Sequence, residues 1–173
     1  MIPGQGGSGP EHWQSRWESR LSTSRRVEQD DWEKPDRHAW SARLAEAVNA
    51  TTRPLVLVAH ALGIPTLVNA VPRLTADVRG ALLVAPPDLG DEQLKPGELK
   101  TFGPYPRDPL PFPSILIGSQ NDPFCSLAVA EDLAAAWGSL FINAGEAGHI
   151  DAEAGYGPWP EGSLTLAKLL SRI

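Results

Sequence analysis

The feature that most constrains this chain is the apolar run from Pro54 to Ala59, which has no polar side chain on either face. A strand with two apolar faces needs cover on both, as the central strand of a parallel sheet has when helices pack on its two sides. Short apolar stretches recur along the chain, and segments with helical periodicity separate them. This alternation predicts a doubly wound, mostly parallel α/β sheet.

The expected strands lie at 55–59, 81–85, 115–119 and 140–143, with a weaker candidate at 26–29. The expected helices run from a capping box at Ser8–Glu11 through Trp13, Trp17 and Leu21, from Pro35–Asp36 to Val48, over 61–74, from Ser126 to Gly138, and over 160–170. Ligands of such sheets bind at the carboxyl ends of the strands. The loops to search therefore follow Ile2, Ala59, Ala85, Ser119 and Asn143.

Length and composition restrict the class of protein. A chain of 173 residues predicts a single domain, residues 1–173. A formal charge of -6 argues against nucleic acid as a partner, and no apolar run approaches the roughly 20 residues of a membrane span. A single cysteine, Cys125, excludes a disulfide framework, and the first residues do not resemble a secretory signal. We therefore expect a cytoplasmic protein.

The segment after the central strand reads Ala59-His60-Ala61-Leu62-Gly63 and leads into a helix. A sharp turn between strand and helix is where α/β-hydrolases carry the G-x-S-x-G nucleophile elbow. Here Ala59 replaces the first glycine, and Ala61 occupies the nucleophile position. Because an alanine methyl cannot attack a carbonyl carbon, the chain as given lacks the covalent step.

An acid and a histidine follow in the chain order of an α/β-hydrolase triad. Asp122 comes directly after the expected strand 115–119, and His149 lies on the loop after 140–143. In a triad, His149 would take the nucleophile's proton and Asp122 would fix the tautomer of its imidazole. The alternative is that Asp122 is a turn residue before Pro123 and that His149 is a surface histidine.

An oxyanion hole requires two backbone N–H groups aimed at the developing negative charge. The amide of Leu62 follows the elbow position, and the amide of Gln5 lies in the glycine-rich turn after the expected first strand. Gly4, in the same turn, would border the substrate. The plain alternative is a flexible N-terminal turn. No lysine followed by serine or threonine comes after these glycines, which excludes a P-loop.

Other residues near the expected site have simpler roles. We expect His60 to be a packing or hydrogen-bonding neighbour close to the substrate rather than a catalyst, and Trp159 to line the rim beside His149. No cluster has the spacing of metal ligands, so neither a metal nor a cofactor is expected. The other expectations are a structural thiol at Cys125, solvent-facing or capping histidines at 12 and 38, and core tryptophans at 32, 40 and 137.

The motifs together resemble a known family. They are Pro3–Gln14, Asp31–Trp40, Val58–Gly63, Ser119–Ser126 and Gly148–Gly162. Over nearly the whole chain they are similar to the small, lidless serine hydrolases related to retinoblastoma-binding protein 9 and the YdeN-like proteins. The resemblance implies a minimal α/β-hydrolase fold, a Ser-Asp-His triad and carboxylester hydrolysis. It places the family's nucleophile at Ala61, its acid at Asp122 and its base at His149.

The chain departs from this family at two points. The family motif reads His-Ser-Leu-Gly where this chain has Ala61. Its members also have a strand of about five or six apolar residues before the Pro-Gly pair, whereas here only Met1 and Ile2 precede it. We therefore expect the first strand to be nearly absent from this chain, and its neighbours to carry unpaired backbone groups. A start codon placed too late or a shortened chain would explain this simply, whereas a real deletion would require another segment or a partner chain to fill the gap.

Two main hypotheses follow. In the first, favoured here, the natural protein is a serine esterase of small ester or acyl substrates, and Ala61 is an engineered Ser→Ala change. In the second, the chain is a natural non-catalytic relative that binds a small ligand or a partner. A third hypothesis is an interaction module that docks through the proline-rich loop 86–113; otherwise that loop forms one wall of the cleft. The sequence does not indicate the oligomeric state or the natural substrate.

Overall fold

The computed structural model describes residues 1–90 and 97–173. Its sheet has four parallel strands in the order β1-β2-β3-β4, which are β1 (Leu55–His60), β2 (Val78–Val84), β3 (Ser114–Gly118) and β4 (Leu140–Asn143). These elements confirm the four main predicted strands, with ends that shift by up to three residues. The predicted parallel sheet is therefore present.

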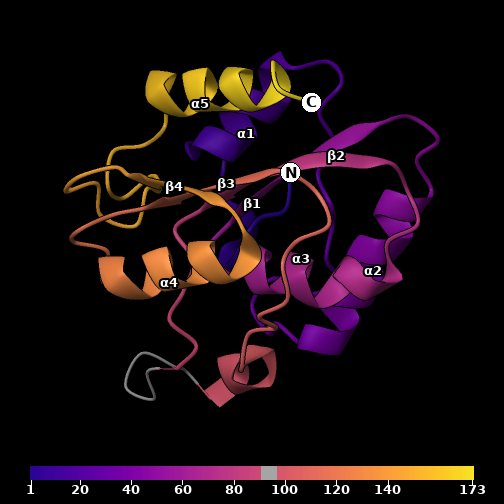
Figure 1. Cartoon of the computed structure of the whole chain (residues 1–173), viewed down its shortest axis with the longest axis horizontal. Coiled ribbons are helices and arrows are strands. Elements are labelled where there is room, and N and C mark those ends of the chain that lie inside the picture. The colour runs from indigo at the N-terminus through magenta and orange to yellow at the C-terminus, as the bar shows by residue number, and fades with distance from the viewer. Residues whose placement is uncertain (91–96) are drawn as a thin grey trace.

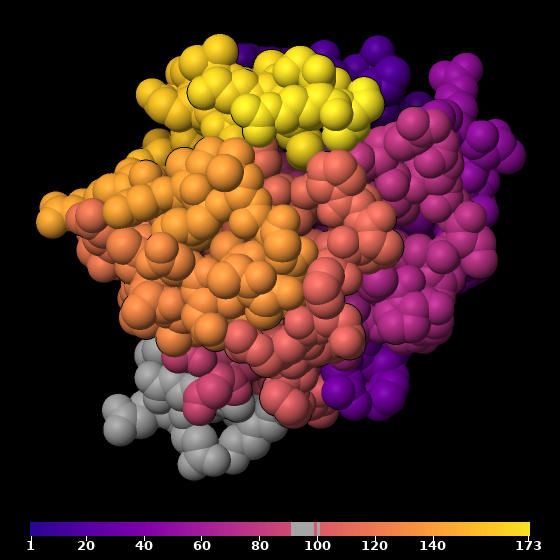
Figure 2. All heavy atoms as spheres, viewed as in Figure 1, coloured from indigo at the N-terminus to yellow at the C-terminus, as the bar shows by residue number. Residues whose placement is uncertain are grey.

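Helices cover both faces of the sheet (Figure 1). On one face lie α1 (Trp13–Arg20) and α5 (Pro160–Leu170); on the other lie α2 (Arg37–Asn49), α3 (Gly63–Ala70) and α4 (Leu127–Trp137). The described residues also form three short 3-10 helices, η1 (Gln5–Gly7), η2 (Val71–Arg73) and η3 (Gly97–Phe102). The architecture is the doubly wound one that the sequence predicts, with no lid among the described residues. Figure 2 shows the same side with all atoms drawn as spheres. The atoms of α5 at the top, the strands in the middle and α4 below them are in contact with one another.

Each strand supplies both core layers because successive side chains point to opposite faces. Leu57 and Leu83 belong to the layer that packs against α2, α3 and α4. Val58 and Leu82 belong to the layer under α1 and α5. This explains why the run at 54–59 is apolar at every position. Trp137 lies in the first layer, as expected.

The helix ends follow local capping chemistry, with one error in prediction. The Asp36 side chain accepts a hydrogen bond from the Ala39 amide and caps α2, and Ser126 caps α4 in the same way. The capping box predicted at Ser8–Glu11 is wrong. The N-cap of α1 is His12, whose imidazole accepts from the Gln14 amide. His12 is thus a capping residue, and at 5% exposure it does not face solvent.

The first strand is nearly absent, as expected. Ile2 forms an isolated parallel bridge with Ala59, and Met1 exchanges backbone hydrogen bonds with Arg25 and Val27. Residues 26–29 were predicted as a weak strand, but the structure assigns none there. The neighbouring segment consists only of Met1 and Ile2, and only Met1 bonds to residues 25–27, which is too little pairing for a strand. The prediction of a strand at 26–29 is therefore wrong. A groove of about 1030 Å³ continues along the free edge of β1.

The groove has an apolar lining from three elements. Its walls include Val56 and Val58 of β1, Val48 of α2, and Leu166 and Leu170 of α5. Burial in this region lowers the pKa of the Met1 ammonium group to about 6. Beyond the bridge to Ile2, the edge of β1 faces this groove.

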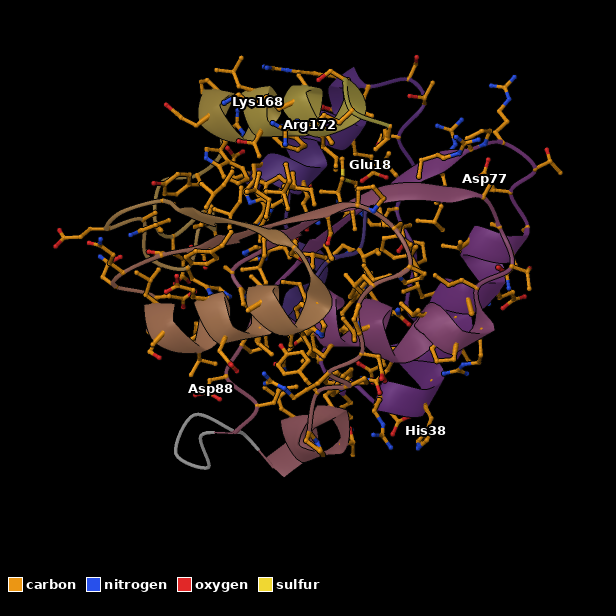
Figure 3. The ribbon with its side chains drawn as sticks, viewed as in Figure 1. Glu18, His38, Asp77, Asp88, Lys168 and Arg172 are labelled. Carbon is orange, nitrogen blue, oxygen red and sulfur yellow. The ribbon has the colours of Figure 1, made fainter. Side chains whose placement is uncertain are left out.

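The carboxyl ends of the strands define the functional edge. Asp77 directly precedes β2, and Figure 3 shows Asp88 away from the sheet, below α4, where the chain leads from β2 into the loop. The predicted site residues Ala61, Asp122 and His149 follow the carboxyl ends of β1, β3 and β4. Figure 3 also labels Lys168, which lies on α5, and Arg172, which lies just beyond the end of that helix. No described helix has the length and apolar content needed to cross a membrane.

Candidate active site

The elbow after β1 has the strained backbone of a nucleophile turn. Ala61 adopts a φ of 49°, in the left-handed region that costs free energy for a residue with a Cβ. Its amide donates to the Val84 carbonyl oxygen at 3.0 Å, and its carbonyl oxygen accepts from Ile64 at 2.9 Å. These bonds hold the side chain of residue 61 at the tip of the turn, between β1 and α3.

Glycine is required beside the elbow because the N-terminal segment passes close to it. A Cβ on Gly63 would lie 2.2 Å from the Ile2 carbonyl oxygen. A Cβ on Gly4 would lie 3.0 Å from the Cβ of Ala61 and 3.1 Å from the Leu62 nitrogen. The glycine-rich turn and the elbow are therefore in van der Waals contact.

This contact brings the two predicted oxyanion donors to one place. Gln5 begins η1, and Leu62 is the N-cap residue of α3. Within the described part of the chain, neither backbone amide donates a hydrogen bond to another residue. Two free N–H groups beside the nucleophile position are what an oxyanion hole provides.

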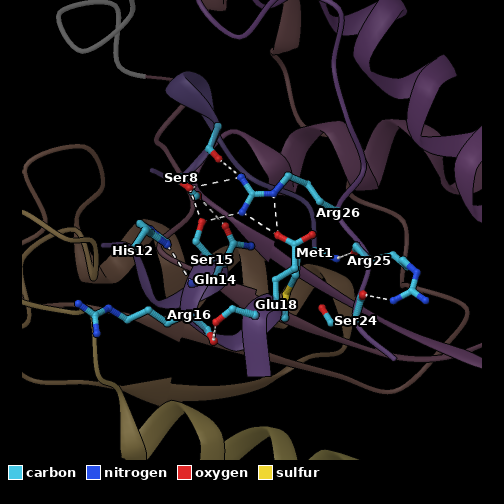
Figure 4. Close-up of polar contacts among 12 residues, drawn as sticks. Met1, Ser8, His12, Gln14, Ser15, Arg16, Glu18, Ser24, Arg25 and Arg26 are labelled. Atoms are coloured by element: carbon cyan, nitrogen blue, oxygen red, sulfur yellow. Dashed lines mark hydrogen bonds and ion pairs between the residues drawn. The ribbon is translucent and has the colours of Figure 1, made fainter. Parts of the chain in front are cut away.

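An arginine holds the glycine-rich turn in place (Figure 4). The Arg26 guanidinium donates to the carbonyl oxygens of Gly7 and Ser8, to Ser15 Oγ at 2.6 Å and to Glu18 at 2.9 Å. The Arg26 side chain is 15% exposed, so these contacts are well shielded from water. Sequence reasoning missed Arg26 because the segment around it has no recognisable motif.

The predicted acid and base form a pair. Nδ1 of His149 lies 3.0 Å from each carboxylate oxygen of Asp122, whose side chain is 2% exposed. Asp122 Oδ1 also accepts from the Phe124 amide at 2.9 Å. The Phe124 ring packs edge-on against the imidazole, with centroids 4.7 Å apart. Bonding at Nδ1 leaves Nε2 of His149 as the basic nitrogen.

Two residues just before Asp122 fix the loop that carries His149. Asn121 Oδ1 accepts from the Gly148 amide at 2.7 Å, and Ser119 Oγ accepts from the Ala147 amide at 2.9 Å. Sequence reasoning did not assign these roles. The signal was available, since polar side chains directly after a strand end lie beside the loop that follows the next strand.

His60 lies beside the base. Its side chain is 4% exposed, and Nε2 lies 2.9 Å from the His149 carbonyl oxygen. His60 is thus a packed and hydrogen-bonded neighbour of His149, and its closeness to a substrate stays a prediction. Trp159 is not at the rim. It is 6% exposed and packs against Trp13 and Trp17 in the core under α1 and α5, so its assignment to the substrate surface is wrong.

The proline-rich loop covers the elbow side of the sheet. Leu89 and Phe102 from this loop pack with Leu62 and Trp40 in a small apolar cluster. Trp32 packs edge-on against Trp40 but is only half-buried. It was expected in the core and is therefore only partly a core residue. Positions 91–96 of the loop lie outside the described residues.

Cys125 is a buried free thiol with 3% exposure. Burial raises its pKa to about 12, so it is a thiol rather than a thiolate at neutral pH. Across residues 1–90 and 97–173, no three His, Cys, Asp or Glu side chains come together as they would around a metal ion.

The order of these parts along the chain defines the class. An elbow after one parallel strand, then an acid and then a histidine after later strands, is the arrangement of α/β-hydrolases. A family model described as serine hydrolase matches residues 1–168. The chain belongs to this serine hydrolase family.

Solved structures give the same assignment. A YdeN-like hydrolase from Pectobacterium atrosepticum is 34% identical, with a TM-score of 0.85 over 97% of this chain and 87% of that one. The ydeN gene product of Bacillus subtilis is 18% identical, with a TM-score of 0.76 over 98% and 96%. The thioesterase RedJ of Streptomyces coelicolor is 15% identical, with a TM-score of 0.67 over 99% and 88%. The last two show the fold alone. No curated protein matches the chain.

Proposed function

We propose that this fold performs carboxylester hydrolysis through a Ser-Asp-His triad, and that Ala61 makes the present chain inactive. The observation that carries the proposal is the Asp122–His149 pair beside an elbow at positive φ. In the active form, the Oγ of a serine at position 61 would attack the ester carbonyl while His149 Nε2 took its proton. The Gln5 and Leu62 amides would bind the oxyanion, and water activated by His149 would release the acid.

The proposal extends to substrate and setting. A site with no lid in the described part of the chain suits small or exposed acyl groups, so the substrate would be a small ester or acyl compound, without a cofactor or metal. In this proposal, residues 1–173 form one domain and the protein is cytoplasmic. Neither nucleic acid nor a membrane is its partner. Support comes from the net charge of -6 and from the single reduced cysteine.

The origin of Ala61 distinguishes two explanations of this chain, an engineered substitution and a natural loss of the nucleophile. An engineered Ser→Ala change explains why the oxyanion turn and the Asp122–His149 pair remain complete. A natural pseudohydrolase that binds a ligand or partner is the second candidate. The codon at position 61 of the source gene tests this. A serine codon would exclude the second explanation, and an alanine codon would exclude the first.

The reaction is tested by the variant Ala61→Ser with p-nitrophenyl esters of short and long acyl chains. We expect turnover of the short esters and very little in the parent, because loss of a nucleophile costs on the order of 10⁶ in kcat. A folded variant that hydrolyses none of these esters would refute the proposed chemistry. Turnover of long-chain esters alone would refute the small-substrate assignment.

A further inference from the structure

Three histidines form a chain that ends at the proposed base. The ring centroids of His12 and His60 are 4.7 Å apart, and those of His60 and His149 are 4.9 Å apart. His12 and His60 are 5% and 4% exposed, and the proposed mechanism uses neither. Such deeply buried imidazoles need a structural or functional reason, because each carries two polar nitrogens.

The hydrogen bond from His60 sets the tautomer of that ring. A carbonyl oxygen only accepts, so His60 must carry its proton on Nε2 to donate to the His149 carbonyl oxygen at 2.9 Å. The ring itself is held edge-on by His12 and by Trp13, whose centroid lies 5.9 Å away. The donor therefore has a fixed position relative to β1, and so to the elbow that follows it.

His149 is attached at two points. Asp122 binds its side chain at Nδ1, and the hydrogen bond from His60 holds its own backbone, whereas Asn121 and Ser119 hold the loop at the two residues before it. The next residue, Ile150, has a φ of 49°, and its carbonyl oxygen accepts a hydrogen bond from Trp13 Nε1 at 2.9 Å. The backbone and the side chain of His149 are thus held by residues of different elements. Together these contacts determine the direction of His149 Nε2.

We infer that His60 is a positioning residue for His149, holding its backbone so that Nε2 faces residue 61, and that His12 keeps the His60 ring in place. The inference rests on the proposed function. Burial lowers the pKa of His60 well below its ordinary value and that of His12 to about 4. Both rings are therefore neutral near pH 7 and place no positive charge beside the imidazolium that His149 forms during turnover.

The first test uses the parent chain and needs no nucleophile. Nitrogen-15 NMR of the imidazoles distinguishes the two neutral tautomers of each histidine. We expect His60 and His12 to carry the proton on Nε2 near pH 7, and Nδ1 of His149, which faces the Asp122 carboxylate, to bear a proton. A proton on Nδ1 of His60 would overturn the inference, whether or not the esterase proposal is correct.

The second test compares His60→Gln with His60→Leu in the Ala61→Ser background. A glutamine amide can replace the Nε2–H donor, whereas leucine cannot. We expect His60→Leu to lower kcat by about 10²-fold with a smaller change in KM, as misplacement of a catalytic group by about 1 Å does. His60→Gln should restore most of this loss. Equal losses in two folded variants would overturn the positioning role, and His60→Met replaces leucine if that variant does not fold.

The control is His38→Leu, at an exposed position of α2. It should leave kcat unchanged, and an equal loss there would show that the effect at His60 is not specific. Failure of the proposed function is recognised separately. In that case Ala61→Ser has no activity to lose, and the tautomer of His60 alone decides the inference.

Discussion

Both carboxylate oxygens of Asp122 lie 3.0 Å from Nδ1 of His149, in a chain that has no side-chain oxygen at residue 61. The pair is nearly shielded from solvent, with side-chain exposures of 2% and 13%. Its geometry depends on the loops after β3 and β4 and on the hydrogen bond from His60. None of these contacts requires a hydroxyl at the elbow, so the site can stay assembled without its nucleophile.

Asp122→Asn in the Ala61→Ser background should lower kcat by about 10⁴-fold, because an amide favours the wrong tautomer of the histidine. Ester hydrolysis by the two variants measures this effect. Asp108→Asn, at an exposed position, is the matched control and should leave kcat unchanged. A loss of less than about tenfold in Asp122→Asn would show that the carboxylate does not orient the base.

Arg26→Met should loosen the glycine-rich turn that carries Gln5. The substitution removes charge-assisted hydrogen bonds to Gly7, Ser8 and Ser15 together with the ion pair to Glu18. We expect the free energy of unfolding to fall by about 2 kcal/mol, measured by urea denaturation. Arg53→Met, at an exposed position, should change it by less than about 0.5 kcal/mol. Equal effects would show that the buried network contributes nothing specific.

The groove beside β1 should accept a strand joined to Met1. Five residues, Val-Ile-Val-Ile-Val, fused before Met1 would extend the single bridge of Ile2 and pair with the free edge at Val56 and Val58. We expect the free energy of unfolding to rise by about 2 kcal/mol, since apolar burial exceeds the entropy cost. Hydrogen exchange at the Val58 amide should slow.

The control for this fusion has proline at its third position, which removes a donor and disfavours a central strand. It should give neither the stabilisation nor the slow exchange. If both fusions stabilise the chain equally, the groove does not recognise a strand.

His12 should make stability depend on pH. Burial lowers its pKa from 6.5 to about 4, so the folded state keeps it neutral while the unfolded chain binds a proton below pH 6.5. The free energy of unfolding should therefore fall as the pH drops from 6.5 towards 4, by up to about 1.4 kcal/mol per pH unit from this group. His12→Gln should flatten this part of the profile, measured by urea denaturation. An unchanged slope would contradict the assignment.

The sequence predicts the fold and the catalytic order well for a physical reason. Strands of a parallel sheet end at one edge, so residues that follow them meet there whatever the intervening helices do. Asp122 and His149 could be paired on this ground alone. The helix caps Asp36 and Ser126 could also be predicted from the sequence, because a cap depends on a few adjacent residues.

Contacts that depend on ring orientation could not be predicted. The direction of the His60 ring follows from its packing on His12 and Trp13, which come from another element. Trp159 was placed at the rim because it is near His149 in sequence, yet the loop between them returns it to the core. The candidate strand at 26–29 failed because its partner segment has only two residues.

The most direct test of the account is active-site labelling of Ala61→Ser with a fluorophosphonate, beside the parent and the double variant Ala61→Ser/His149→Gln. The account predicts stoichiometric labelling at residue 61 in the first protein and none in the parent. The double variant should react far more slowly, because it lacks the base that activates the serine. A folded Ala61→Ser chain that is not labelled, or labelling that is equally fast without His149, would contradict the proposed triad.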